Sequence, residues 1–174
     1  MRDAATLGEG AFDAVVAYGG PLSYVFDDAP AAFAGLLRTV RPDGVVLASV
    51  MSIAGAVRYF LPLVADEMEL YGLDVYDDIM QTGDIRAIGA DRTTSHTCRM
   101  FRWREIEALI AAEPCRLVGA SASNWMSLGD PEVLERIEAD PERWSWFVDW
   151  EVKLCREPGA LDGGTHTLFA VQRT

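Results

Sequence analysis

The side chains that could carry acid, base or nucleophilic chemistry form no recognised catalytic pattern. There are two histidines, His96 and His166, and the chain shows neither a Ser-His-Asp arrangement nor a convincing pair of carboxylates. Histidine titrates near neutral pH and can act as a general base. His96 is the better candidate because it stands in an expected loop before a helix, although an ordinary hydrogen-bonded loop histidine is the alternative. His166 begins the last expected strand, and we expect it to be structural.

Three cysteines, Cys98, Cys115 and Cys155, are widely spaced along the chain and form no Cys-x-x-Cys pair. A structural zinc site needs clustered cysteine and histidine ligands, so we expect no metal site. Scattered cysteines in odd number fit reduced thiols in a reducing compartment.

A short apolar run near the amino terminus leads into a loop that contains two glycines and a proline. Residues 14–17 have the composition of a buried parallel strand. Gly19 and Gly20 follow it, and glycine lets the backbone turn sharply and lets a ligand approach closely. In open α/β sheets, ligands bind at the carboxyl ends of the strands. Residues 18–24 are therefore the first candidate site, and a tight connection without a ligand is the alternative.

A helix, a turn and a strand are predicted after this loop. Acidic residues at 27 and 28 and a proline at 30 mark a helix start. Apolar residues then recur at helical spacing up to residue 40. Residues 42–44 read as a turn and residues 45–50 as the next buried strand. The pattern predicts an α/β fold with strands joined through helices.

Farther along, apolar spacing predicts a helix from residue 53 that Pro62 kinks or splits, because proline lacks the N–H that the helix needs. Residues 66–84 are rich in acids and aromatics and fit a sheet poorly. The other expected elements are an extended segment at 96–101, a helix from residue 103, a strand at 116–120, helices at 131–139 and 141–157, and a last strand at 164–171.

The order of these pieces resembles the middle and end of a class I S-adenosylmethionine-dependent methyltransferase. In that family an acidic residue plus Ala, a short loop and then F-D-x-V open the fourth strand. Asp3-Ala4 and Phe12-Asp13-Ala14-Val15 are similar to these pieces. Residues 36–47 look like the family's next helix, turn and fifth strand, and residues 164–171 look like its final antiparallel strand.

The resemblance implies one methyltransferase-like domain over residues 1–174. Its sheet would be a partial Rossmann-like one, holding the fourth to seventh strands in the spatial order four, five, seven, six, with flanking helices. The family's glycine-rich loop after the first strand and its acidic residue after the second have no counterpart here. By this comparison the domain is truncated at its amino terminus by on the order of 60 residues.

The resemblance also implies the function, which is methyl transfer from the cofactor S-adenosyl-L-methionine to a small-molecule acceptor, weakened by the missing segment. An alternative is a non-catalytic partner subunit or fragment, which docks onto a twin or a complementary chain through the open edge strand near residues 12–18. A nicotinamide-dependent reductase is a further alternative, but the chain lacks G-x-G-x-x-G and Tyr-x-x-x-Lys.

Several residues acquire roles from the resemblance alone. Asp3 would accept a hydrogen bond from the adenine amino group, and Ala4 would make a backbone contact beside it. Leu22 and Tyr24 would help to close the pocket. Tyr24 would also contact the acceptor. The strand end that faces the methionine and methyl end of the cofactor comprises Ala17, Tyr18 and Gly19.

Residues 53–101 are expected to form a lid or substrate insertion. Its acids and aromatics, Tyr76 among them, suit a cationic or amine-bearing acceptor, and a solvated loop is the alternative. Arg102 could meet an acidic group on the acceptor or form a surface salt bridge. Trp144, in an aromatic run, could complete an apolar substrate wall or simply pack in the core.

Composition limits the partners. The 174 residues are 50% hydrophobic, which suits one domain, and carry a net charge of −12 with a single lysine, Lys153. Nucleic acids and anionic membranes attract clustered basic residues, so we expect neither as a partner. No apolar run reaches membrane-spanning length and no basic, apolar leader is present. These features predict a cytoplasmic protein.

Overall fold

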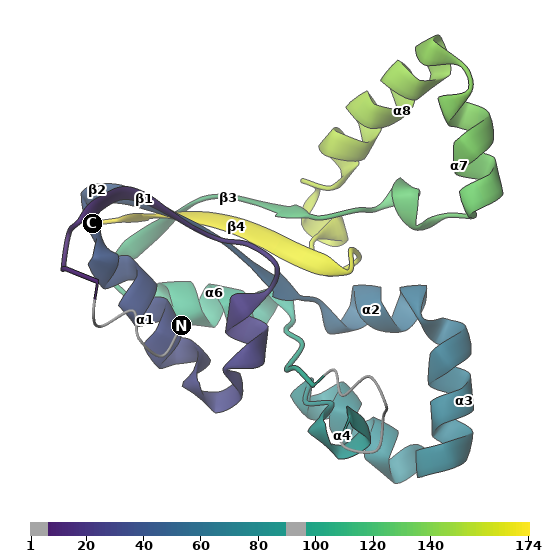
Figure 1. Ribbon diagram of the computed structural model, residues 1–174, viewed down its shortest axis with the longest axis horizontal. Helices are drawn as coiled ribbons and strands as arrows, with labels where there is room; N and C mark the ends of the chain where they lie inside the picture. The colour runs from purple at the N-terminus through teal and green to yellow at the C-terminus, as the bar shows by residue number, and fades with distance from the viewer. Residues whose placement is uncertain (1–6, 90–96) are drawn as a thin grey trace.

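The computed structural model describes residues 7–89 and 97–174 (Figure 1). Its elements, in chain order, are β1 (Phe12–Ala17), the short 3-10 turns η2 (Pro21–Tyr24) and η3 (Phe26–Asp28), α1 (Ala29–Thr39), β2 (Val40–Met51), α2 (Ile53–Tyr59), α3 (Leu61–Tyr71), α4 (Leu73–Thr82), α5 (Arg86–Gly89), α6 (Trp103–Ala111), β3 (Cys115–Ala122), η4 (Met126–Leu128), α7 (Pro131–Glu138), α8 (Pro141–Leu154), η5 (Pro158–Ala160) and β4 (His166–Arg173).

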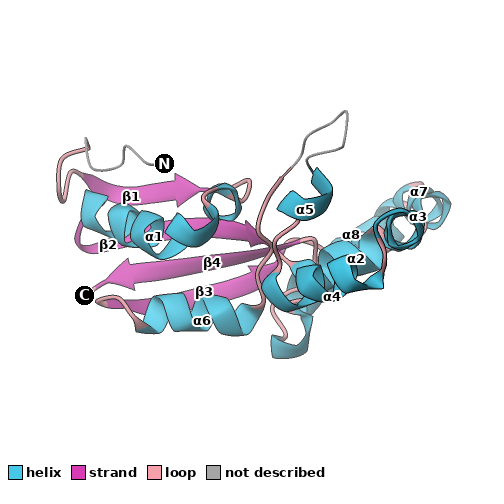
Figure 2. Ribbon diagram, turned by 90° about the horizontal axis from the view of Figure 1, so that it is seen from below, coloured by secondary structure: helices cyan, strands magenta, loops and turns pink. Residues whose placement is uncertain are grey.

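Four strands form one sheet in the order β1-β2-β4-β3 (Figure 2). β1 runs parallel to β2, and β4 runs antiparallel to both of its neighbours. This order is the predicted one, with the last strand inserted antiparallel between the two before it. The predicted α/β fold class is confirmed.

β2 begins earlier than the sequence predicted, at Val40, because the expected turn is absorbed into the strand as an irregularity. Asp43 adopts a φ of 64°, and the register between β1 and β2 shifts between Phe12 and Ala14. A Cβ on Gly44 would lie 2.8 Å from the carbonyl oxygen of Arg41 and 3.0 Å from that of Asp13. Glycine is required there because any side chain would push the paired strands apart.

The main core lies between the sheet and the two helices α1 and α6, which cover the same face (Figure 2). Phe33 of α1 meets Phe169 of β4 edge to face, with ring centroids 6.0 Å apart. Val46 and Val50 of β2 and Ile106 of α6 are also fully buried. The helical spacings in the sequence predicted these two apolar stripes correctly.

None of the described helices lies over the opposite face of the sheet (Figure 1). Val15 and Ala17 of β1 face the main core, so Val16 points to the other side, because side chains alternate along a strand. The side chain of Val16 is 64% exposed, and Val118 of β3 is exposed as well. We call this the bare face.

Two helical parts extend beyond the carboxyl ends of β1, β2 and β3 (Figure 1). The helical extension, residues 53–89, is split at Pro62 as predicted, with Phe60 between α2 and α3. Ile53 and Ile79 belong to its small core, and Met100 packs into that core from outside the extension.

The second part is the aromatic arm, residues 125–155, which contains α7 and α8. Phe147 is the buried residue of α8, and Trp144 stacks on it with ring centroids 5.5 Å apart. Trp146 is 60% exposed and Trp150 is partly exposed. One interpretation of this aromatic run was packing in the core. Most of these rings are too exposed for that.

The arm is fixed at its base by Glu151. Its carboxylate accepts the backbone N–H groups of Trp125 at 2.8 Å and Met126 at 2.7 Å and also bonds Ser127. Arg58 of the helical extension lies over the Trp125 ring, 4.9 Å from its centroid. The two helical parts therefore meet beside the end of the sheet.

Candidate functional site

The loop between β1 and α1, residues 18–24, lies at the carboxyl end of the parallel strands. Gly19 and Gly20 take φ values of 82° and 71°, in the left-handed region that favours glycine. A Cβ on Gly19 would meet no atom within 4 Å, whereas one on Gly20 would lie 3.4 Å from Cγ of Met51. The backbone at Gly19 is therefore open to an approaching ligand, and Gly20 packs against the end of β2.

Two buried serines fasten this loop to β2. The hydroxyl of Ser49 accepts the N–H of Gly20 at 3.1 Å, and the hydroxyl of Ser23 accepts the N–H of Met51 at 2.9 Å. Buried amides need such partners because water cannot reach them. The loop conformation is thus fixed by the strand beside it.

The predicted cofactor residues differ in what they expose. Tyr18 is about half exposed, while the side chains of Ala17 and Leu22 are buried in the main core. Ala17 and Leu22 could therefore contact a ligand only through the backbone or support the loop from the core. Tyr18 and Gly19 are the residues that a ligand could contact directly. Asp3 and Ala4 lie outside the described residues.

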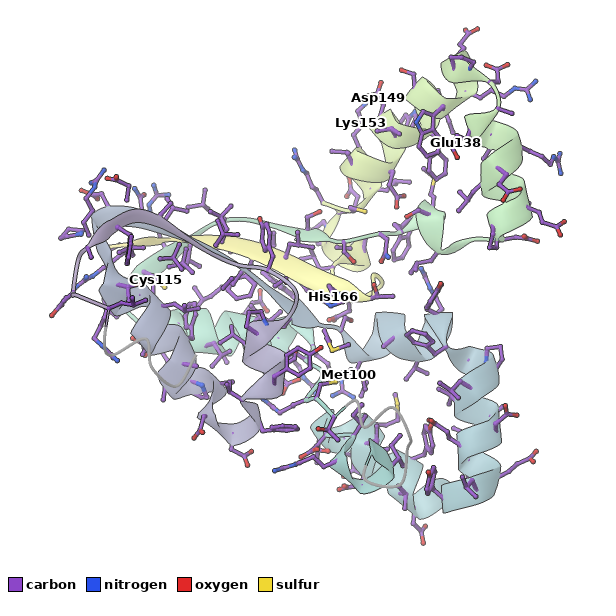
Figure 3. The ribbon with its side chains drawn as sticks, viewed as in Figure 1. Met100, Cys115, Glu138, Asp149, Lys153 and His166 are labelled. Carbon is purple, nitrogen blue, oxygen red and sulfur yellow. The ribbon has the colours of Figure 1, made fainter. Side chains whose placement is uncertain are left out.

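His166 lies at this site, although the sequence favoured His96. As the first residue of β4 it pairs with Met51, and its Cδ2 would be 3.8 Å from a Cβ on Gly20. Figure 3 shows His166 at the end of the sheet. Burial lowers the pKa of His166 below its ordinary value, so the neutral imidazole is favoured. His96 lies outside the described residues.

Tyr24 ends the turn η2. Burial, and to a lesser degree the nearby Cys98 thiol, raises the pKa of its hydroxyl. The backbone N–H of Arg99 donates to the carbonyl of Ser23 at 2.8 Å, so residues 97–100 run alongside the loop.

The other predicted acceptor residues are not brought together. Tyr76 is buried in the helical extension, where its hydroxyl donates to the carboxylate of Glu67. Arg102 lies at the start of α6, and its guanidinium donates to the backbone carbonyl of Met80 in α4. Trp144 lies on α8 in the aromatic arm, on the other side of the molecule from α4 (Figure 1).

The described ranges contain no group of three or more side chains able to hold a metal ion. Nor does any helix within residues 7–89 or 97–174 have the length and apolar character needed to cross a membrane.

No protein-family model matches the chain, and no curated protein matches it. Solved structures do match. An S-adenosylmethionine-dependent methyltransferase from Mesorhizobium loti is 14% identical, with a TM-score of 0.53, over 96% of this chain and 64% of that one. The chain therefore has the fold of a large part of that methyltransferase.

Two further structures match more loosely. Phosphoethanolamine N-methyltransferase 2 of Haemonchus contortus, solved with S-adenosyl-L-methionine, is 16% identical over 96% of this chain and 34% of that one, with a TM-score of 0.43. The [4+2]-cyclase SpnF is 13% identical over 95% and 51%, also with a TM-score of 0.43. This chain spans less than two thirds of each of the three proteins. At these identities the likeness concerns the fold, and a fold hosts many functions.

Proposed function

We propose that this chain carries the acceptor-side part of an S-adenosylmethionine-dependent methyltransferase that acts on a small molecule. The observation that carries the proposal is the strand order β1-β2-β4-β3 with β4 antiparallel, together with the open glycine turn at the carboxyl end of β1. This is the place where α/β sheets bind their ligands.

The geometry of the loop fits the methionine end of the cofactor. The backbone at Gly19 has free space beside it, and the half-exposed ring of Tyr18 stands next to it. In this proposal Tyr18, Gly19 and the backbone of Ala17 hold that end, while Leu22 supports the loop from the core.

The bound cofactor supplies a methyl group on a sulfonium, a leaving group that is already activated. The protein then has to align the acceptor and exclude water. Residues 53–101 would serve as the lid over the acceptor. If the acceptor loses a proton, the neutral imidazole of His166 would be the base that receives it.

A second function, a subunit that docks onto another chain, is favoured by the bare face and by β1. In the described sheet β1 pairs on one side alone, with β2. An open edge and an exposed Val16 invite strand pairing and apolar contact with a twin or a complementary chain.

Calorimetric titration of S-adenosylhomocysteine into the purified chain tests the first function. We expect binding in the micromolar range, because this product occupies the same pocket as the donor. A folded chain that gives no heat at millimolar ligand would contradict it. The second function then predicts a molar mass that rises with concentration in light scattering.

A further inference from the structure

A groove with a volume of about 530 Å³ lies over β4 and β3. Residues 118–121 of β3 and residues 168–170 of β4 line it, together with Tyr18 and Arg156. We call it the sheet groove. Small-molecule sites have volumes of about 300–1,000 Å³, and a cavity of about 150 Å³ already holds benzene. The sheet groove therefore has room for a ligand of one or two rings.

The floor of the sheet groove belongs to the bare face. Val16 pairs with Leu47, and Leu47 pairs with Ala170. Gly119 pairs with Ala170 from the other side. Residues that pair across strands turn their side chains to the same face of a sheet. Gly119 and Ala170 therefore face the same side as Val16.

Small residues make this floor low, and larger side chains stand beside it. A Cβ on Gly119 would meet no atom within 4 Å, and Ala170 adds a single methyl group. Val118 and Tyr18, each about half exposed, also line the groove. A flat ligand could thus lie close to the sheet and contact the Tyr18 ring, and aromatic rings gain from such contacts beyond the area they bury.

Arg156 supplies a positive charge to the sheet groove. The carbonyl of Cys155 accepts the N–H of Ala122, the last residue of β3, at 2.8 Å, and this bond brings the end of α8 to the groove. No other described residue forms an ion pair or a hydrogen bond with the guanidinium of Arg156, although the chain carries a net charge of −12. The guanidinium is therefore available to an anion.

The charge and shape of this group favour a carboxylate. Arg156 is the one charged residue of the described lining, which contains no acid, so a ligand with one negative charge balances it. The planar guanidinium can bind a carboxylate through two parallel N–H donors. A phosphate monoester carries close to two negative charges at neutral pH and would need a second cation.

We propose that the sheet groove binds an aromatic carboxylate, with the carboxylate on Arg156 and the ring over Gly119 and Ala170 beside Tyr18. This assignment does not rest on methyl transfer. In the sheet order, β4 and β3 lie away from the open edge of β1, so strand pairing at that edge would leave the floor of the groove open.

The test compares two probes with one skeleton, 2-naphthoate and the uncharged 2-naphthylmethanol, titrated by calorimetry into the chain at pH 7 without cofactor. The naphthoate should bind at least about tenfold more tightly than the alcohol. Arg156→Gln should weaken naphthoate binding by about tenfold and change alcohol binding by no more than about twofold. Arg136→Gln, which removes the same charge at an exposed position on α7, should change neither.

A second variant, Gly119→Val, tests the floor of the groove. Valine suits a strand, and the open space above Gly119 can accept its side chain, so the variant should fold. The added methyl groups would occupy the place of the ring, and both probes should bind about tenfold or more weakly.

Equal affinities for the two probes, no binding of either to the folded chain, unchanged naphthoate affinity in Arg156→Gln, or unchanged affinities in Gly119→Val would each overturn the proposal. An affinity for naphthoate that falls as the chain concentration rises would assign the groove to a second copy of the chain and also overturn it. If Arg156→Gln does not fold, Gly119→Val and the ratio of the two probes on the unmodified chain decide.

The outcome is separate from that of the titration with S-adenosylhomocysteine. Naphthoate binding without binding of S-adenosylhomocysteine keeps the groove assignment and removes methyl transfer. The reverse result removes the groove assignment alone.

Discussion

At the residue scale, the hydroxyl of Ser23 connects the candidate loop with β2. Ser23→Ala leaves the half-buried N–H of Met51 without its acceptor at 2.9 Å, so the free energy of unfolding should fall by about 1 kcal/mol. Urea denaturation measures the change. Ser145→Ala, on the exposed side of α8, is the control and should stay within about 0.5 kcal/mol of the original chain. Equal stability of the two variants would show that the Ser23 bond does not fix the loop.

His166 predicts a dependence of stability on pH. Burial lowers its pKa in the folded chain, so the unfolded chain binds the proton more readily. The free energy of unfolding should therefore decrease as the pH falls through the ordinary histidine pKa of about 6.5. The decrease should level off below the folded pKa.

His166→Gln should remove this part of the pH dependence, and urea denaturation between pH 8 and pH 5 tests it. His96 is present in both the original chain and the variant, so the difference between their pH dependences comes from His166. The same slope in both proteins would contradict the assignment.

At the element scale, Glu151 joins the aromatic arm to the turn at Trp125. Burial raises the pKa of this carboxyl group, but the Ser127 hydroxyl and the three backbone N–H groups outweigh burial and lower it. The stabilisation is present above the ordinary glutamate pKa and is lost as the pH falls through the lowered one.

Glu151→Ala leaves those N–H groups without their acceptor, so the segment around residues 125–127 should open more often. Limited proteolysis there should be faster by on the order of tenfold. Glu135→Ala, on the exposed face of α7, should be cleaved like the original chain. If the Glu151 variant is cleaved no faster than this control, the carboxylate does not hold the arm.

Much of the element order could be predicted because local patterns decide it. The stripes that end at Val40 and begin at Trp103 predict α1 and α6, and Pro62 predicts the break between α2 and α3. The start of β2 could not be predicted, because residues 42–44 read as a turn unless the pairing with β1 is known.

The candidate site was predictable in part for the same reason. Gly19 and Gly20 indicate the loop from composition alone. The position of His166 beside it depends on the pairing of β4 with β2, which joins residues more than a hundred positions apart. The Glu67–Tyr76 pair likewise depends on how α3 packs against α4.

At the scale of the whole molecule, we expect the bare face and the open edge of β1 to decide whether the chain associates. Val16→Asp places a charge on that face at a side chain that is already 64% exposed, so the folded chain should lose little stability. Light scattering should show the original chain growing in mass with concentration and the variant remaining a monomer. Leu70→Asp, at an exposed position on α3, should associate like the original chain. A chain that is monomeric at every concentration would contradict this prediction.

The central claim is that the glycine turn after β1 holds the cofactor, and two matched glycine variants test it. Gly19 and Gly72 both take φ values above 80°, and a Cβ on either would meet no protein atom within 4 Å. Alanine therefore strains the backbone at both positions, but only the Gly19 position belongs to the candidate loop.

The decisive measurement is the calorimetric affinity of these two variants for S-adenosylhomocysteine. Gly19→Ala should bind it about tenfold or more weakly than the original chain, whereas Gly72→Ala should bind it as the original chain does. Equal affinities in Gly19→Ala and Gly72→Ala would place the cofactor elsewhere and contradict the account.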